Sequence, residues 1–305
     1  MLLAYKEKKG LGPKSNPDPN KIINERAVFK RIVFIRHGES DWNNVFNKGI
    51  NISLIFRLIS ALKEESLLFF TSMDSKFIDS PLNHEGIEQA LELRRFIEST
   101  NHPECSSSTN EVISVLRGDS KTSSIIVSST LRRAIATTTL ALWPRVDKKE
   151  EKIIVLSSLQ EISRNVDTRA LSKPKEVADL PFSRIKDKCQ SKNRPFDRDN
   201  LYDATENYGN KRSNFNGILR LRAFNEWAFK RTEDVIIVGG HSLWFKYFFQ
   251  TYLPHKSNHQ AKSMKITNSG VVTFIIYRSN DTDGTPLYRI DESTIECVYG
   301  SFTKK

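Results

Sequence analysis

Four short runs of consecutive apolar, largely β-branched residues constrain the fold of this chain more than any other feature. They are Ile32–Ile35, Ile125–Val127, Ile153–Leu156 and Val235–Val238. A strand with one face in water alternates apolar and polar residues, whereas a continuous apolar run is typical of a strand buried on both faces. Such strands form parallel sheets that are covered by helices on both sides. The runs therefore predict the centre of an α/β protein.

Segments with helical periodicity lie between these runs. Two apolar stripes at spacings of three and four residues predict helices, the first of them capped by Asn83. Further helices are expected at roughly 216–230 and 242–252, and closing β structure at Val271–Tyr277 and Leu287–Tyr299. We therefore expect a three-layer α/β/α sandwich with a mostly parallel central sheet. The stripes are Ile87, Ala90, Leu91 and Ile97, and then Leu131, Ala134, Ile135, Thr138 and Leu142.

The 305 residues are expected to form one folded domain behind a tail. Residues 1–29 combine lysines and prolines without an apolar period, so we expect a flexible basic tail, and the domain is expected to span 30–305. Three insertions, 44–78, 100–122 and 164–214, exceed what a minimal sandwich needs. The second is rich in Ser, Thr and Asn and is expected to be a surface loop. The third is expected to be irregular or to form a small cap.

The first insertion contains an amphipathic segment at 50–70. Its apolar residues favour a packed helix, and a lid, a dimer surface and a membrane-surface helix are the alternatives. Arg57 and Lys63 are matched by Glu64 and Glu65, so the segment lacks the excess positive charge typical of a membrane-surface helix.

Composition narrows the class of protein. No run of about 18 uncharged apolar residues occurs and no secretory signal is recognisable, so a soluble, cytoplasmic chain without a transmembrane segment is predicted. Cys105, Cys189 and Cys297 are far apart, which favours reduced thiols over a disulfide framework or a zinc cluster. The net charge of +11 favours anionic ligands. No nucleic-acid-binding motif accompanies it, so nucleic acid is not an expected partner.

Residues with phosphate chemistry follow each of the four apolar runs. Arg36 and His37 follow the first run, Arg133 the second, Glu161 the third and His241 the fourth. The carboxyl ends of parallel strands meet at one edge of the sheet, where open α/β proteins bind ligands. Each residue alone would be an ordinary structural residue, but their conjunction indicates an active site for an anion at this edge. A cation is disfavoured where a helix begins, so Arg133 also requires an anion nearby.

The residues at the first strand end resemble the signature of the histidine phosphatase superfamily, which includes cofactor-dependent phosphoglycerate mutases and many phosphomonoesterases. They read Arg36-His37-Gly38-Glu39-Ser40-Asp41-Trp42-Asn43. Further blocks in the family's order extend the resemblance over about residues 31–280. These blocks are Asp79-Ser80-Pro81-Leu82 with Gly86 and Gln89-Ala90, Ser129-Thr130-Leu131-Arg132-Arg133-Ala134, Leu159-Gln160-Glu161, and Gly240-His241-Ser242.

The resemblance implies a phosphoryl-transfer site that needs no metal or other cofactor. It implies that His37 is the nucleophile, that Glu161 protonates the leaving alcohol, and that His241 stabilises developing charge. An imidazole attacks phosphorus only when it is neutral and its other nitrogen is held by a hydrogen bond, typically to a backbone carbonyl. His255 and His259 have helical spacing but no carboxylate motif, so no metal site is expected there. The implied phosphate-binding residues are Arg36, Asn43, Arg133 and His241.

Departures from the mutase pattern favour a phosphatase. About 35 residues separate Asn43 from Asp79, where phosphoglycerate mutases have a short segment. Neither the Arg-x-Tyr-Gly block after the mutase glutamate nor the Gly-Asn after the second histidine is present here. A phosphatase has only to release the alcohol and admit water. A mutase-type transferase and a scaffold or signalling member with weak turnover are the alternatives, and the intact catalytic set disfavours the scaffold.

Four basic residues follow Glu161 within the third insertion and are candidates for substrate specificity. One or more of them could bind a second anionic group of the substrate, or they could form a solvated basic face. The expected partner is a small phosphorylated substrate or a phosphoprotein, while the identity of the ester and the oligomeric state stay open. The four residues are Arg164, Arg169, Lys173 and Lys175.

Overall fold

The computed structural model of the chain describes residues 27–46, 75, 77–99, 102–180, 185–190, 196–211, 216–281 and 284–304. Most of the expected basic tail and the segment at 50–70 lie outside the described residues. Within the described residues, no helix has both the length and the apolar character needed to cross a membrane.

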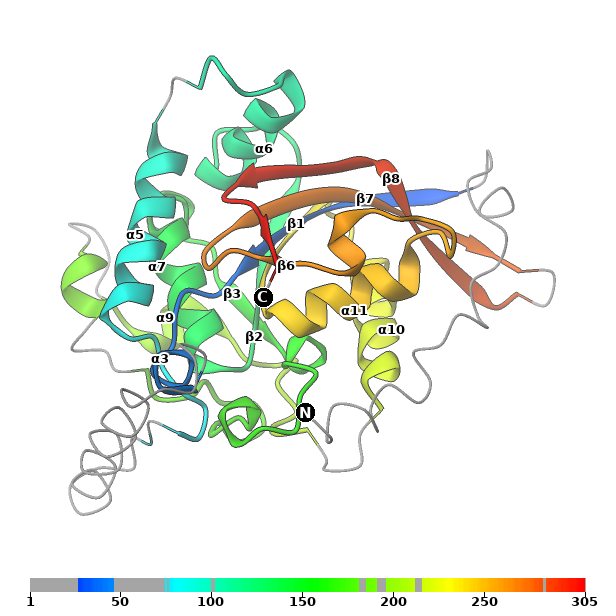
Figure 1. Cartoon of the computed structure of the whole chain (residues 1–305). Helices are drawn as coiled ribbons and strands as arrows, with labels where there is room; N and C mark the ends of the chain where they lie inside the picture. The colour runs from blue at the N-terminus through cyan, green and yellow to red at the C-terminus, as the bar shows by residue number, and fades with distance from the viewer. Residues whose placement is uncertain are drawn as a thin grey trace.

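A seven-stranded sheet forms the centre of the fold, with the strand order β4-β3-β2-β5-β1-β7-β8. Its strands β1, β7 and β8 lie side by side (Figure 1). The five strands from β4 to β1 are parallel, and β7 and β8 continue the sheet in the antiparallel sense. All four apolar runs are strands, which confirms the mostly parallel sheet. The strands are β1 (Val28–Arg36), β2 (Ser124–Ser129), β3 (Ile153–Leu156), β4 (Tyr202–Asp203), β5 (Val235–Gly240), β7 (Val271–Asn280) and β8 (Pro286–Tyr299).

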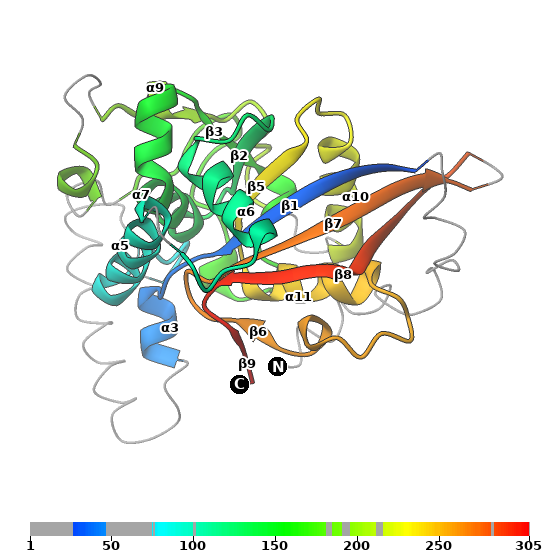
Figure 2. The same cartoon turned by 90° about the horizontal axis from the view of Figure 1, so that it is seen from above.

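Helices cover both faces of the sheet, so the expected three-layer sandwich is confirmed (Figures 1 and 2). Val33 and Ile35 of β1 pack into one hydrophobic core and Ile32 and Phe34 into the other, as the alternation of side chains along a strand requires. One core is shared with α5 (His84–Glu98), α6 (Ser107–Arg117) and α7 (Arg132–Lys149), and the other with α10 (Gly217–Ala228) and α11 (Ser242–Tyr252).

Short elements complete the described fold. Asn83 caps α5 as expected, because its side chain accepts a hydrogen bond of 2.8 Å from the backbone N–H of Gly86. The remaining elements are α3 (Asp41–Phe46), η2 (Ser157–Leu159), η3 (Val166–Thr168), η4 (Lys186–Lys188), α9 (Arg198–Leu201), η5 (Gln260–Lys262), and a two-stranded sheet of β6 (Lys265–Ile266) and β9 (Phe302–Thr303).

The prediction of a surface loop at 100–122 is wrong, because α6 occupies its centre. The side chain of Ser106 caps the helix, and Gly118 ends it in the left-handed conformation at φ +82°. Val112 and Leu116, four residues apart, are buried in the core. The polar composition of the segment concealed an apolar stripe bounded by both a start and a stop signal.

The third insertion, 164–214, contributes an edge strand that the sequence did not predict. Tyr202 and Asp203 of β4 pair with Ile153 and Ile154 of β3. A strand of two residues carries no period by which a sequence pattern could identify it. The other described residues of the insertion are mostly irregular, with single turns of helix, as expected.

Candidate active site

The sheet order brings the four predicted strand ends together, because β3, β2, β5 and β1 are neighbours. A cavity of about 110 Å³ lies at this carboxyl edge. His241 does not line the cavity but lies beside it, with its ring centroid 5.1 Å from that of His37. Five of the predicted residues do line it, and these are Arg36, His37, Asn43, Arg133 and Glu161.

Two glycines fix the turn that follows His37. A Cβ atom on Gly38 would overlap the carbonyl oxygen of Gly86, and one on Gly86 would overlap the backbone of Glu39. The side chain of Gln89 accepts a hydrogen bond of 2.8 Å from the N–H of Glu39. The first two sequence blocks therefore meet through backbone contacts that only glycine permits, and α5 locks the loop that carries His37.

The imidazole of His37 has the orientation that a nucleophile needs. Its Nδ1 lies 2.6 Å from the carbonyl oxygen of Gly38, which can only accept, so Nδ1 carries the proton and Nε2 the lone pair. The side chain is almost completely buried. Burial, followed by the charges of Arg133 and Arg36, holds the pKa of His37 well below its usual value. The ring is therefore neutral at physiological pH.

The second histidine, His241, is fully buried at the end of β5. Burial, with the charges of Arg133 and His37 next in size, holds its pKa well below the usual value. Its Nε2 lies 2.7 Å from the hydroxyl oxygen of Ser129, and its Nδ1 has no hydrogen-bond partner among the described residues. A buried ring nitrogen without a hydrogen-bond partner destabilises the fold unless a ligand forms a hydrogen bond with it.

Three cations line the cavity, and one of them was not predicted. Arg36 donates through Nη1 to the carbonyl oxygen of Ile266, and burial lowers its pKa to about 10, so it remains charged at neutral pH. Lys265 precedes Ile266 on β6 and lines the same cavity as Arg36 and Arg133. It belongs to none of the sequence blocks, and its placement depends on the pairing of β6 with β9.

An acidic residue in the cavity, Asp167, was also missed. Arg133 donates through Nη1 to the carbonyl oxygen of Asp167 at 2.7 Å, and its Nη2 lies 3.3 Å from the Asp167 carboxylate. Burial raises the pKa of Asp167. The protein thus supplies an anion of its own beside the arginine at the start of α7. Asp167 lies in the third insertion, where no sequence pattern set it apart from other acids.

The carboxylate of Glu161 is held by backbone N–H groups. Its Oε1 accepts hydrogen bonds from Ile162 and Trp244, both at 2.8 Å, and its Oε2 accepts one from Leu243 at 3.2 Å. Leu243 and Trp244 lie in the first turn of α11, where N–H groups have no partner within the helix. The helix that begins after His241 therefore orients Glu161.

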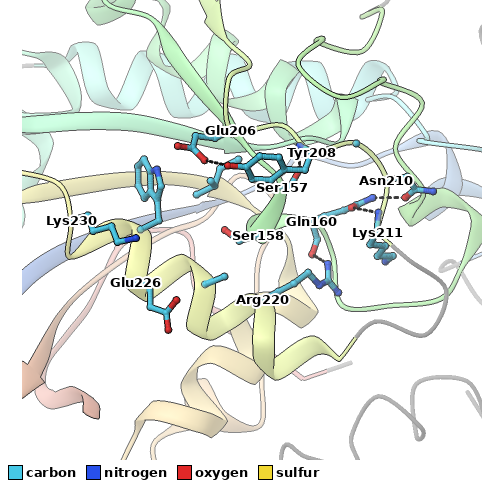
Figure 3. A pocket seen from close by; sticks show the side chains of 14 residues that line it. Ser157, Ser158, Gln160, Glu206, Tyr208, Asn210, Lys211, Arg220, Glu226 and Lys230 are labelled. Carbon is cyan, nitrogen blue, oxygen red and sulfur yellow. Dashed lines mark hydrogen bonds between the residues drawn. The ribbon is translucent and has the colours of Figure 1, made fainter. Parts of the chain in front are cut away.

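A second layer of cations holds the backbone around Glu161. Lys211 donates through Nζ to the carbonyl oxygens of Glu161, at 2.6 Å, and Ser163. Arg220 of α10 donates to the carbonyl oxygen of Gln160 (Figure 3) and to that of Glu161. Neither cation was predicted, because α10 and the segment before it carry no motif. Together they fix the path of the chain on both sides of Glu161.

Both of these cations also line a larger cavity, of about 580 Å³ (Figure 3). Its walls include Tyr208, Trp227 and Lys230 as well as Lys211 and Arg220. Its lining residues include no histidine, so of these two cavities only the smaller one is lined by a histidine, His37.

The four basic residues proposed for specificity line neither cavity. Arg164 is partly buried, while Arg169, Lys173 and Lys175 are exposed. The described structure thus brings the catalytic set together without them, and their contact with a substrate stays a prediction.

Comparison with known proteins gives matches to solved structures alone. No family model and no curated protein matches the chain. The structure is similar to "Mycobacterial hydrolase 1", at 14% identity and a TM-score of 0.42 over 90% of this chain and 100% of that one. It is also similar to a mycobacterial glucosyl-3-phosphoglycerate phosphatase in complex with VO3 (13%, TM-score 0.39, 86% and 97%) and to a phosphoglycerate mutase from Bacillus anthracis (14%, TM-score 0.42, 87% and 92%). Matches this distant assign no activity, so the residues of the site must carry the argument.

Proposed function

We propose that this chain is a member of the histidine phosphatase superfamily and hydrolyses phosphate monoesters through a phosphohistidine on His37. The observation that carries the proposal is the hydrogen bond between His37 Nδ1 and the Gly38 carbonyl, which leaves Nε2 unprotonated in a cavity lined by cations. The motif resemblance and the meeting of four strand ends support the same reading.

Substrate binding in this proposal is electrostatic. Arg36, Arg133 and Lys265 surround the phosphoryl group, whose charge is spread over its equatorial oxygens in the transition state. Asn43 adds a neutral amide to the same lining. His241 donates a hydrogen bond from its Nδ1–H, which has no partner among the described residues, to a phosphoryl oxygen, while the Ser129 hydroxyl donates a hydrogen bond to its Nε2. Binding of the anion thus gives the buried Nδ1 of His241 the hydrogen-bond partner that it otherwise lacks among the described residues.

Two proton transfers by Glu161 complete the reaction. His37 Nε2 attacks phosphorus, the bond from phosphorus to the ester oxygen breaks, and Glu161 gives its proton to the departing alcohol. Glu161 then takes a proton from water. The resulting hydroxide attacks phosphorus, and the bond from nitrogen to phosphorus breaks to release inorganic phosphate and neutral His37. The backbone bonds to the Glu161 carboxylate hold it in place for both transfers.

Phosphatase is favoured over mutase because a mutase must also orient the alcohol and return the phosphoryl group to it. The small cavity offers room for a phosphoryl group, and the rest of the ester would extend beyond it. The proposed substrate is a small phosphorylated compound or a phosphoprotein, and the proposed location is cytoplasmic.

Release of inorganic phosphate from an aryl phosphate in the presence of EDTA tests this proposal. We expect turnover by the wild type, an acid-labile and base-stable phosphoryl label on the protein, and loss of both in His37→Asn. Retained folding of His37→Asn is checked by circular dichroism. A wild type that is folded and shows neither turnover nor label would reject phosphohistidine catalysis. Labelling by a bisphosphoglycerate without phosphate release would instead indicate a mutase.

A further inference from the structure

The turn between α5 and α6 brings together three side chains that can bind a metal. His102, Glu104 and Cys105 each offer a ligand atom, and these atoms lie within 4.8 Å of one another. The Nδ1 of His102 lies 4.0 Å from a carboxylate oxygen of Glu104. No sequence motif combines these three residue types at this spacing, so the mixed set was not predicted.

The ring of His102 already has the tautomer of a metal ligand. Its Nε2 lies 3.0 Å from the carbonyl oxygen of Phe96 and 3.1 Å from that of Ser99. Carbonyls can only accept, so Nε2 carries the proton and Nδ1 presents its lone pair on the side of Glu104. A histidine that binds a metal commonly donates its other N–H to a backbone carbonyl in this way. The side chain is only 8% exposed, so its orientation is fixed.

The backbone of the turn is also set without a metal. The N–H of Cys105 donates to the carbonyl oxygen of His102 at 3.1 Å, which closes a turn with the two ligands at its first and fourth positions. The side chain of Asn110, in α6, donates to the carbonyl oxygens of both His102 and Cys105. His102 and Cys105 are separated by two residues, which is also the spacing of the Cys-x2-Cys pairs in zinc sites.

We propose that His102, Glu104 and Cys105 bind a zinc ion, with water as the fourth ligand. A thiolate, an imidazole and a carboxylate suit Zn²⁺, whereas Mg²⁺ and Ca²⁺ prefer oxygen ligands. Tetrahedral bonds of zinc place ligand atoms about 3.6 Å apart, so the cluster must close by about 1 Å. Glu104 is 72% exposed and can rotate to do so.

The alternative is that His102 only terminates α5 by satisfying its last carbonyl groups. That role uses Nε2 alone and leaves unexplained why Glu104 approaches the opposite nitrogen and why Cys105 lies in the same cluster. The proposed metal site is also remote from the catalytic cavity. The 15 residues of α5 span about 22 Å, and Gly86 near its start packs against Gly38 beside His37. Zinc binding is therefore expected to leave phosphatase turnover unchanged.

Titration of the reduced, metal-free protein with Co²⁺ tests the site. A thiolate bound to Co²⁺ gives a near-ultraviolet charge-transfer band, so we expect this band to saturate at one equivalent and to disappear when Zn²⁺ is added. Cys105→Ser should abolish the band, and Glu104→Gln should weaken Co²⁺ binding at least tenfold. Cys297→Ser is the matched control, because Cys297 is an exposed thiol outside the cluster and its removal should leave the band intact.

Three results would overturn the proposal. They are the absence of the band in the folded wild type, its persistence in Cys105→Ser, and its loss in Cys297→Ser. Thermal unfolding of each variant shows whether the turn is retained, since Cys105→Ser removes no hydrogen bond that the structure assigns to the side chain of Cys105. Phosphatase turnover is measured separately and does not enter this test, so failure of one proposal leaves the other standing.

Discussion

The carboxylate of Asp167 lies 3.3 Å from the guanidinium of Arg133, inside the cavity that His37 lines. An arginine expected to hold a phosphate is therefore already paired with an acid of the protein. An incoming phosphate dianion gains the attraction of Arg133 but meets the repulsion of Asp167. In the proposed reaction, this arrangement would limit the affinity of the site for the product, inorganic phosphate, and so favour its release.

Replacing this acid should tighten phosphate binding. We expect Asp167→Asn to lower both KM for an aryl phosphate and the inhibition constant of inorganic phosphate about tenfold, equivalent to about 1.4 kcal/mol. The two constants are measured by steady-state kinetics at neutral pH. Asp179→Asn removes an exposed carboxylate that does not line the cavity and should change neither constant. A higher KM in Asp167→Asn would show instead that Asp167 is needed to position Arg133.

The third cation of the cavity, Lys265, should act mainly on substrate binding. We expect Lys265→Met to raise KM about tenfold with a smaller change in kcat, because the lysine attracts the phosphoryl group without forming or breaking a bond. Lys265→Arg, which keeps the charge, should recover most of the loss. Equal KM values for Lys265→Met and the wild type would remove Lys265 from the phosphate site.

The layers of the fold could be predicted because buried strands and amphipathic helices have patterns that do not depend on distant residues. The four apolar runs and the cap at Asn83 show this. Composition led to the wrong prediction for α6, because the segment is rich in serine. The helix packs into the core through Val112 and Leu116, and the serines around them do not affect this packing. The strand β4 needed the edge of β3 to form, so no local pattern could reveal it.

The residues of the candidate site also fall into two groups, those that the sequence predicts and those that it does not. Arg36, His37 and His241 adjoin strand ends, so topology alone brings them together. Asp167 and Lys211 come from the third insertion, and their positions depend on contacts between segments far apart in the chain. Sequence spacing carries no information about such contacts, and the same holds for the mixed ligand set at His102.

Lys211 should act as a positioning residue for Glu161. Lys211→Met removes its hydrogen bonds to the carbonyl oxygens of Glu161 and Ser163, and we expect kcat for an alkyl phosphate to fall 10- to 100-fold. With an aryl phosphate whose leaving group needs no proton, kcat/KM, which reports formation of the phosphohistidine, should change little, because Glu161 is required as an acid only for a poor leaving group and as a base only in the later hydrolysis step. A purely structural defect would lower both rates equally.

A second lysine provides the control for this experiment. Lys262 also donates through Nζ to backbone carbonyl oxygens, those of Pro254, His255 and Ser257, each at 3.0 Å, and it does not line the catalytic cavity. Lys262→Met should therefore destabilise the fold to a similar degree and leave kcat for both substrates unchanged. If both variants lose activity alike, the effect of Lys211 is on stability alone.

The two buried histidines should make the fold less stable in mild acid. Their folded-state pKa values are depressed, so below the unfolded value of about 6.5 the unfolded chain binds protons that the folded chain does not, and stability falls as the pH falls. At pH 5.5 the loss amounts to about 1.4 kcal/mol for each histidine. Asp79, whose pKa burial raises to about 6, has the opposite dependence between about pH 4 and 6.

Comparison of the wild type with the double variant His37→Asn/His241→Asn isolates the histidines, since Asp79 contributes to both proteins. Urea unfolding at pH 7.5 and pH 5.5 gives the change in the free energy of unfolding for each. We expect the wild type to lose about 2.5 kcal/mol more than the double variant on acidification. Equal losses would mean that the two imidazoles are protonated in the folded protein at pH 5.5, and a protonated His37 could not be the nucleophile there.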